Sequence, residues 1–351
     1  MDLIYSLSIK SKNNHKKQQK KMKTKIISAL ATAVCATMFC ACHFLNHDSI
    51  SQTELVRNTY PNNAYKPIPM EYMRPCEKGG TLSRFTYKTR NNQIPGSPEF
   101  EKYAVIYLPY GYDENNASKR YDVLYMMHGG AVDQEWFFGR EGQRSPLKNI
   151  LDNMIQNGDM KPLIVCVVSF YTNYNRDATK NCLDFHYELK KDLMPVFEKK
   201  YHTYAQGTTL EDFKASRGHR AFTGYSMGAC GTWAAFEFCI DEIKYFLPMS
   251  GDCWNIGQNR YAETAEHLCK MLKEKGKTSN DFKIYAGAGT RDMAEPNLTP
   301  FVNELKKHPD TFLYTDNFGT GNLYHCIVPN GGHDLNTAMQ LLYNGLPKTF
   351  D

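Results

Sequence analysis

The chain has 351 residues, of which 42% are hydrophobic and 23% charged, a composition typical of an ordinary globular protein. The formal net charge of +5 arises near the N-terminus, where eight lysines lie between Lys10 and Lys25. From Cys42 onward, 34 basic and 36 acidic residues nearly balance. The chain therefore lacks the excess of basic residues that forms a nucleic-acid-binding face, which argues against a nucleic-acid partner.

Residues 22–42 have the layout of an export signal. They read "MKTKIISALATAVCATMFCAC", in which two lysines precede an uninterrupted run from Ile26 to Ala41. This run is too short for a transmembrane helix, and it matches the apolar region of a signal peptide. We therefore predict that residues 1–42 are an export signal, with Met22 as an alternative start, and that the protein is secreted, periplasmic or on the outer surface.

The end of this signal resembles the processing site of bacterial lipoproteins. The small residue Ala41 precedes Cys42, whereas Phe39 stands where that pattern prefers Leu. Lipidation of Cys42 stays open, and such an anchor is the expected route to membrane contact.

Cysteines are frequent after Cys42, but their spacing does not indicate a zinc site. They lack a C-x-x-C pair and histidines at ligand spacing. Export would permit disulfides, which the sequence cannot assign. We interpret Cys166 and Cys326 as core residues because they lie in apolar strand-like runs. The cysteines are Cys76, Cys166, Cys182, Cys230, Cys239, Cys253, Cys269 and Cys326.

Residues 43–75 are rich in Asn, Pro and Tyr and lack apolar periodicity, which is typical of a tether or an N-terminal arm. From about Thr81, strand patterns alternate with helix patterns, and we predict one domain over residues 76–351. The predicted strands are 102–109, 122–130, 162–170, 221–224, 245–251, 282–289 and 322–329. The predicted helices are 147–157, 185–200, 231–239, 262–275, 298–307 and 335–344. This alternation predicts an α/β fold with a mostly parallel central sheet and helices on both faces.

The stretch "GYSMG", Gly224 to Gly228, lies between a short predicted strand and a predicted helix. A sharp turn from strand to helix brings backbones too close for side chains at the two glycine positions. Such a turn holds the Ser226 hydroxyl at the carboxyl edge of the sheet, where open α/β sheets form their ligand crevices. This context, more than the five letters alone, makes Ser226 a candidate nucleophile.

A serine nucleophile needs a base that accepts its proton and a carboxylate that orients the base. His333 is the candidate base, because "VPNGGHDLNTA" places it in a Gly-rich loop between a strand and the last helix. Asp292 follows a strand and completes the chain order Ser, Asp, His of α/β-hydrolases. Asp252 also follows a strand and stays open as the alternative acid. We expect Asp334 to cap the final helix.

Attack on an ester carbonyl creates an oxyanion, which positioned backbone N–H groups must stabilise. One expected donor is the N–H of Met227, the residue after the nucleophile. The other is expected from "HGG", His128 to Gly130, in the loop after an early strand. We assign it to Gly130, with a simple tight turn as the alternative role of this loop.

Aromatic side chains in predicted loops near the strand ends are suited to stack on a phenolic ring or a sugar. They are Trp136, Phe137, Phe138, Tyr171, Tyr174 and Trp254. We select Trp136, Tyr174 and Trp254 as substrate contacts, with packing as the alternative role of each. No metal or organic cofactor is implied, since "GAG" at Gly287 to Gly289 lacks the third glycine of a nucleotide-binding fingerprint.

Several segments longer than the serine motif resemble the carbohydrate esterases of the feruloyl esterase type. The chain is similar to the esterase modules of clostridial xylanases and, more distantly, to esterase D and the mycolyltransferases. The matching segments lie within residues 72–347 and include "YDVLYMMHGG", "LKNILDNMIQNGDMKPLIV", "YFLPMSGDCW" and "TDNFGTGNLYHCIVPNGGH". The resemblance implies an α/β-hydrolase fold without a large lid. It also implies a Ser226, Asp292 and His333 triad, with Gly130 and Met227 as the oxyanion pair.

The resemblance further implies hydrolysis of hydroxycinnamate esters on arabinoxylan. We therefore predict an exported serine esterase that acts on feruloylated arabinoxylan or its oligosaccharides through an acyl-enzyme. Two alternatives keep the same catalytic residues and change the ester, to acetylated xylan or to a siderophore lactone. An alternative of another class is a catalytically silent glycan-binding protein.

Overall fold

The structure of the chain is a computed structural model that describes residues 65–140, 142–316 and 319–350. The predicted export signal and the first part of the predicted arm lie outside the described residues. Within the described residues, no helix has both the length and the apolar character needed to cross a membrane.

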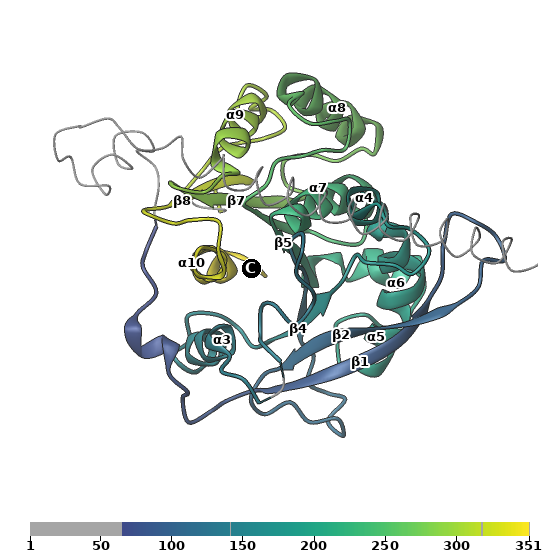
Figure 1. The fold of residues 1–351 in the computed structure, drawn as a ribbon, viewed down its shortest axis with the longest axis vertical. Helices are drawn as coiled ribbons and strands as arrows, with labels where there is room; N and C mark the ends of the chain where they lie inside the picture. The colour runs from purple at the N-terminus through teal and green to yellow at the C-terminus, as the bar shows by residue number, and fades with distance from the viewer. Residues whose placement is uncertain (1–64, 141, 317–318, 351) are drawn as a thin grey trace, which may run out of the picture. The chain divides into compact units, whose positions relative to one another are not determined.

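The strands form one sheet of eight, in the order β1-β2-β4-β3-β5-β6-β7-β8 (Figure 1). β1 pairs with β2, and β2 with β4, in antiparallel fashion, whereas all other neighbours are parallel. The prediction of a mostly parallel sheet is therefore confirmed. The strands are β1 Thr81–Thr89, β2 Phe100–Leu108, β3 Asp122–Met127, β4 Leu163–Val168, β5 Arg220–Tyr225, β6 Tyr245–Met249, β7 Lys283–Gly289 and β8 Leu323–Val328.

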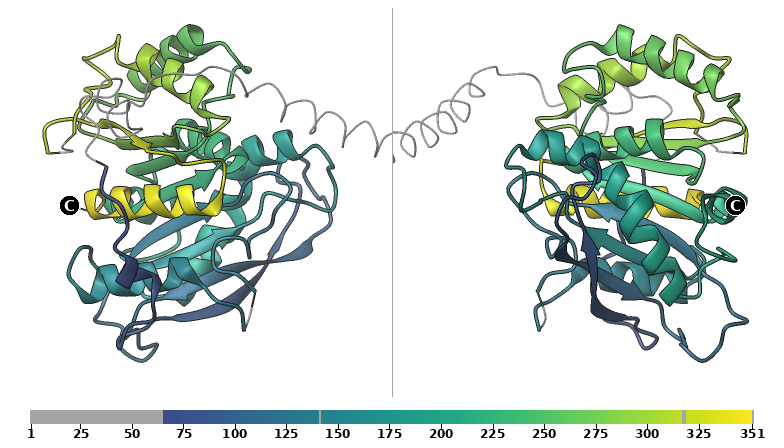
Figure 2. Two further views of the ribbon diagram at one scale, coloured as in Figure 1. Left: turned by 60° about the vertical axis from the view of Figure 1, so that its left-hand side comes forward. Right: turned by 90° about the vertical axis from the view of Figure 1, so that its right-hand side faces the viewer.

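Helices cover both faces of this sheet (Figures 1 and 2). Helices α3 and α10 pack on one face, and α4 to α9 pack on the other. The helices are α3 Pro146–Gln156, α4 Ala178–Glu188, α5 Met194–Lys200, α6 Leu210–Ala215, α7 Met227–Cys239, α8 Tyr261–Glu274, α9 Glu295–Leu305 and α10 Leu335–Gly345. A π-helical segment, Leu189–Leu193, joins α4 to α5.

Two hydrophobic cores follow from this arrangement, one on each face of the sheet. Side chains alternate along a strand, so Leu124 and Met126 of β3 join the core with α3 and α10. Val123, Tyr125 and Met127 join the core on the opposite face. All five are fully buried, which explains why this strand reads as a continuous apolar run.

The structure differs from the sequence prediction at the starts of two helices, at the unpredicted helix α6, at the helix predicted over 185–200, which a π-helical segment divides, and at one strand. Helix α7 begins at Met227, whereas the prediction began at residue 231. Its first turn is the Gly-rich "MGACG", which was not predicted as helix because glycine has a low helix propensity. Helix α4 begins at Ala178, where Asp177 caps a polar first turn by accepting from the backbone N of Lys180 at 3.0 Å. β1 escaped prediction because its first four residues are exposed and show no apolar alternation.

The described part of the predicted arm packs against α10 and α3. Tyr65 Oη donates to Gln340 Oε1 at 3.0 Å, and Asn344 of α10 exchanges hydrogen bonds with the backbone of Lys66 at 2.8 Å. Tyr72 Oη donates to Asp159 at 2.6 Å. These residues are therefore held on the domain, while the domain boundary expected at residue 76 stays a prediction.

Candidate active site

The turn between β5 and α7 places Ser226 at the carboxyl edge of the sheet. Ser226 has φ 58° and ψ −120°, a conformation that non-glycine residues adopt at a cost of about 1–3 kcal/mol and that clusters at functional sites. A Cβ on Gly224 would lie 2.1 Å from the Gly228 carbonyl oxygen, and a Cβ on Gly228 would lie 2.4 Å from that of Met127. Glycine is therefore required by close backbone approach at both positions, as the sequence predicted.

Three predicted residues meet at this turn in one hydrogen-bonded series. Ser226 Oγ lies 2.8 Å from His333 Nε2, and His333 Nδ1 lies 2.7 Å from Asp292 Oδ1. Since a carboxylate only accepts, Nδ1 carries the proton and donates it to Asp292. Nε2 is then the unprotonated nitrogen, which accepts from the Ser226 hydroxyl. This is the tautomer that a general base for Ser226 requires.

The loops after β7 and β8 hold the acid and the base together. Arg291 N donates to Gly331 O at 2.8 Å, and Thr290 N donates to Val328 O at 3.0 Å. Asn330 N donates to Thr290 Oγ1 at 2.9 Å. Because β7 and β8 are neighbours and parallel, both loops leave the same edge, and these bonds fix the approach of Asp292 to His333.

The other two candidate carboxylates have different partners. Asp252 Oδ1 accepts from the Trp254 indole Nε1 at 3.0 Å. Asp334 accepts from the backbone N of Thr337 at 2.9 Å and caps α10, as expected. The geometry therefore favours Asp292 over Asp252 as the partner of His333.

The two predicted oxyanion donors lie in adjacent segments. Met227 is the first residue of α7, so its N–H points out of the helix end without an intrahelical acceptor. A Cβ on Gly129 would lie 3.2 Å from Ser226 Cβ and from the Tyr225 carbonyl oxygen, so the loop after β3 lies directly against the Ser226 turn. The assignment of Gly130 and Met227 as the two oxyanion donors stays a prediction.

The loop after β3, His128 to Ala131, carries the predicted donor Gly130 and is named the oxyanion loop. Its buried histidine is hydrogen-bonded through both ring nitrogens. His128 Nδ1 donates to the Gly129 carbonyl at 2.7 Å, so Nε2 accepts from Ser169 Oγ at 2.8 Å. Burial lowers the pKa of His128 to about 4, and the ring is neutral at pH 7. Beyond the loop, Ala131 N donates to Tyr171 Oη at 3.0 Å. The sequence indicated Tyr171 only as an aromatic loop residue suited to stacking, and no pattern pointed to Ser169.

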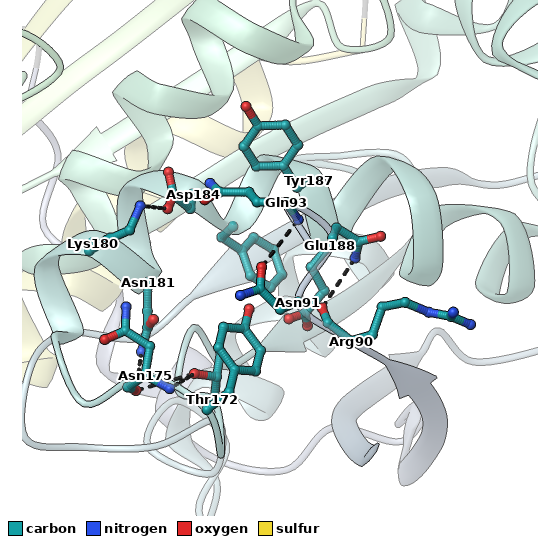
Figure 3. Close-up of a pocket in the computed structure, with 13 residues that line it drawn as sticks. Arg90, Asn91, Gln93, Thr172, Asn175, Lys180, Asn181, Asp184, Tyr187 and Glu188 are labelled. Carbon is teal, nitrogen blue, oxygen red and sulfur yellow. Dashed lines mark hydrogen bonds and ion pairs between the residues drawn. The ribbon is translucent and has the colours of Figure 1, made fainter. Parts of the chain in front are cut away.

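The aromatic residues predicted to contact substrate lie in different places, and two of the three line cavities. Trp136 stacks on Tyr225 at 5.1 Å, and Tyr225 lies 4.9 Å from the His333 ring. Trp136 and Tyr171 line a cavity of about 630 Å³ beside the oxyanion loop. Tyr174 instead lines a second, polar cavity of about 270 Å³ (Figure 3).

The remaining aromatic residues lie away from these cavities. Phe137 and Phe138 are buried in the core on the α3 and α10 face of the sheet, where they serve packing. Trp254 lines neither cavity among the described residues, and its indole is bonded to Asp252. The role of Trp254 as a substrate contact stays a prediction.

The cysteines of the described residues are free thiols. Six of the eight are buried, including Cys166 and Cys326, which lie in strands as expected. Burial raises the pKa of the thiols of Cys182 in α4 and Cys230 in α7, so they stay protonated and unreactive at neutral pH.

Comparison with known proteins assigns the chain to a family. The family model described as "Putative esterase" matches residues 98–344. The chain belongs to the Esterase family. The esterase is 34% identical over 286 residues to "Endo-1,4-beta-xylanase Y" of Acetivibrio thermocellus, which covers 82% of this chain and 24% of that protein.

A second curated relative, "Endo-1,4-beta-xylanase/feruloyl esterase" of Xylanibacter ruminicola, is 32% identical over 136 residues. This match covers 37% of the esterase and 16% of the relative. The esterase thus spans about a quarter or less of the length of these two relatives.

Solved structures agree with the family assignment. The feruloyl esterase module from Clostridium thermocellum, solved as a serine-to-alanine mutant with sinapinate, is 31% identical with a TM-score of 0.72. The match covers 88% of the esterase and 96% of that chain. A ferulic acid esterase from Anaeromyces mucronatus shares the fold at 20% identity, with a TM-score of 0.57 over 82% of the esterase and 97% of that chain. The predicted α/β-hydrolase fold is confirmed.

Proposed function

We propose that this chain is a serine esterase that hydrolyses hydroxycinnamate esters, feruloyl and p-coumaroyl, on plant cell-wall xylan. The observation that carries the proposal is the unbroken hydrogen-bonded series from Ser226 through His333 to Asp292. The acyl group is supported by the relatives, which include a feruloyl esterase module bound to sinapinate, itself a hydroxycinnamate. The glycan is supported by the xylanase names of the curated relatives.

Acylation begins with attack of Ser226 Oγ on the ester carbonyl carbon, while His333 Nε2 takes the hydroxyl proton. Asp292 stabilises the imidazolium that forms and keeps its orientation. The carbonyl oxygen gains a negative charge, which the N–H groups of Met227 and Gly130 receive. One such donor is worth about 3 kcal/mol of transition-state stabilisation.

The tetrahedral intermediate collapses when His333 returns its proton to the leaving sugar oxygen. The sugar alcohol departs, and the hydroxycinnamoyl group stays esterified to Ser226. A water molecule then attacks the acyl carbon as His333 accepts one of its protons. Return of that proton to Ser226 releases the hydroxycinnamate and restores the enzyme.

Initial rates of the purified protein on four substrates test this proposal: methyl ferulate, methyl p-coumarate, p-nitrophenyl acetate and acetylated xylan. We expect the hydroxycinnamates to be strongly preferred, because the cavity beside the oxyanion loop has the Trp136 ring in its wall. Activity confined to acetyl esters would retain the triad and make the protein a deacetylase. Inactivity on all four substrates would overturn the proposal, and siderophore lactones and glycan binding alone would then be tested.

We further propose that the protein is exported, with Cys42 as a lipid-anchored N-terminus. Support comes from the signal-like pattern of residues 22–42, which lie outside the described residues. Intact mass measurement of the processed protein tests it. A diacylglyceryl mass on a chain that starts at Cys42 is expected, and Cys42→Ser should abolish it. A processed chain without added lipid would reduce the proposal to secretion.

A further inference from the structure

We infer that the polar pocket between the β1–β2 turn and α4 is a subsite for the glycan part of the ester substrate. This inference rests on the proposed function and extends it from the acyl group to the leaving group. The pocket is the cavity of about 270 Å³ shown in Figure 3. Its lining residues come from the turn at Arg90–Gln93, the loop at Thr172–Asn175 and helix α4.

The strand order places this pocket at the same edge of the sheet as Ser226. β2 runs antiparallel to β4, so the β1–β2 turn lies beside the loop that leaves the carboxyl end of β4. That proximity is visible in the bond from Lys102 Nζ at the start of β2 to Ser169 O, at 2.6 Å. β3 alone separates β4 from β5, which ends at the Ser226 turn. The pocket extends from the loop after β4 to the β1–β2 turn, so at about 5 Å per strand spacing it lies roughly 10 to 20 Å from Ser226, a range that an oligosaccharide can span.

The same loop also lines both cavities. Tyr171 forms part of the cavity beside the oxyanion loop, and the adjacent Thr172 forms part of the polar pocket. A substrate whose acyl group lies in the first cavity therefore has the second cavity on the other side of a short loop.

The charged groups around the pocket are compensated by one another. Arg90 pairs with Glu99, and Lys180 pairs with Asp184 on the surface of α4. Glu188, on the pocket floor, is buried and pairs with Lys102 at 2.7 Å. Each charged side chain in the described lining thus has an ion-pair partner, while Asp192, outside the lining, accepts from the neutral donors Asn92 Nδ2 and Thr89 Oγ1. The lining itself therefore fits a neutral polar molecule.

The remaining lining groups fit a polyhydroxylated ligand. Each sugar hydroxyl both donates and accepts, and the carboxamide of Gln93 offers a donor and an acceptor together. The Tyr174 ring is 47% exposed, while its edge-to-face contact with Phe100 at 5.8 Å supports it from one side. An exposed and supported ring of this kind is suited to stack on the apolar face of a sugar. Figure 3 shows the amide, hydroxyl and charged side chains of the three segments around the cavity.

The backbone around these groups is held in place before any ligand binds. Asn181 Nδ2 of α4 donates to the Asn175 carbonyl at 2.9 Å, and Asn175 N donates to Thr172 Oγ1 at 3.2 Å. On the opposite wall, Gln93 N donates to Asn91 Oδ1 at 3.1 Å. The cost of ordering these loops on binding is accordingly reduced.

The test compares a feruloylated arabinoxylo-oligosaccharide with methyl ferulate, which share the acyl group and differ in the leaving group. The measured quantity is the ratio of kcat/KM on the oligosaccharide to kcat/KM on the methyl ester. In Gln93→Ala and in Tyr174→Ala we expect this ratio to fall about three- to tenfold, as loss of one such contact predicts. Tyr110→Ala is the matched control, because Tyr110 is 54% exposed and follows β2 at the opposite edge of the sheet.

An unchanged ratio in both variants would overturn the inference, even if both rates fell together, because the pocket would then serve the acyl group or the fold. A second measurement does not depend on turnover. Calorimetry measures the binding of unesterified arabinoxylo-oligosaccharide to the Ser226→Ala variant. This binding should be lost when Gln93→Ala and Tyr174→Ala are added to that variant. Absence of binding to Ser226→Ala itself would also overturn the inference. Failure of the proposed function is recognised separately, by absence of methyl ferulate hydrolysis in the unaltered protein.

Discussion

The Ser226 turn and the polar pocket lie at the same edge of one sheet, but they are built in different ways. The turn is defined by backbone atoms, since Gly224 and Gly228 leave no room for a Cβ. The pocket is defined by side chains of two loops and the surface of α4. Sterics therefore restrict which residues the turn accepts, whereas the pocket tolerates many polar residues. Single substitutions at the Ser226 turn should therefore cause large losses of activity or stability, whereas single substitutions in the pocket should cause small ones.

Ser226→Ala should have the largest effect. Loss of the nucleophile should reduce kcat by at least about 10⁴-fold, leaving what the oxyanion hole and substrate binding supply. The fold should persist, because only one hydroxyl is removed. Steady-state rates on methyl ferulate check the first expectation, and an unchanged thermal midpoint checks the second. Substantial turnover by a correctly folded variant would remove Ser226 from the mechanism.

Asp292→Asn should have the next largest effect, a loss of about 10⁴-fold in kcat. The asparagine amide no longer holds His333 in the tautomer that accepts the Ser226 proton. The matched control is Asp252→Asn, because Asp252 also follows a strand but bonds to Trp254. We expect that variant to stay within about tenfold of the unaltered enzyme. The same assay compares the two, and the reverse order of losses would identify Asp252 as the acid.

Gly228→Ala should destabilise the protein through overpacking, because the new Cβ would lie 2.4 Å from a backbone carbonyl oxygen. A cost of about 1–3 kcal/mol in the free energy of unfolding is typical of such changes. Gly218→Ala is the control, since a Cβ there meets nothing within 4 Å. Denaturant unfolding of both variants checks the contrast. Equal stability of the two would contradict the view that backbone contact defines the turn.

His186→Phe should produce an effect that appears only at acid pH, on the helix that forms one wall of the pocket. His186 lies on α4, where burial lowers its pKa to about 4 from an ordinary value of 6.5. Between these values the unfolded chain binds the proton and the folded chain does not, so stability present above pH 6.5 is lost as the pH falls towards 4.

Phenylalanine removes that titration and keeps a ring stacked on Phe238. The variant should therefore gain up to about 1–3 kcal/mol relative to the unaltered protein between pH 7 and pH 4.5. Urea unfolding of both proteins at the two pH values measures this difference in stability. The carboxylates that both proteins share titrate alike, so they do not contribute to the difference. A difference that does not change with pH would show that His186 titrates normally.

The same contrast explains how much could be predicted from the sequence. Ser226, His333 and Asp292 were recognisable because each follows a buried strand, and parallel strands deliver their ends to one edge. The start of α7 was missed since its glycines are chosen for backbone contact and not for helix propensity. The polar pocket was not visible, because exposed polar residues in the β1–β2 turn carry no periodicity. The bond from the Trp254 indole to Asp252 was likewise not visible, because it depends on side-chain orientation, while the role of Trp254 as a substrate contact stays a prediction.

The loop after β4 couples the two regions mechanically. Tyr171 receives the hydrogen bond from Ala131 N at the end of the oxyanion loop, while its neighbours line the polar pocket. Because the backbone there is already held by hydrogen bonds, a glycan bound by the side chains next to Tyr171 adds its binding energy close to the segment that carries Gly130. Part of that energy is then expressed in the transition state. Long substrates should accordingly be favoured in turnover number as well as in affinity.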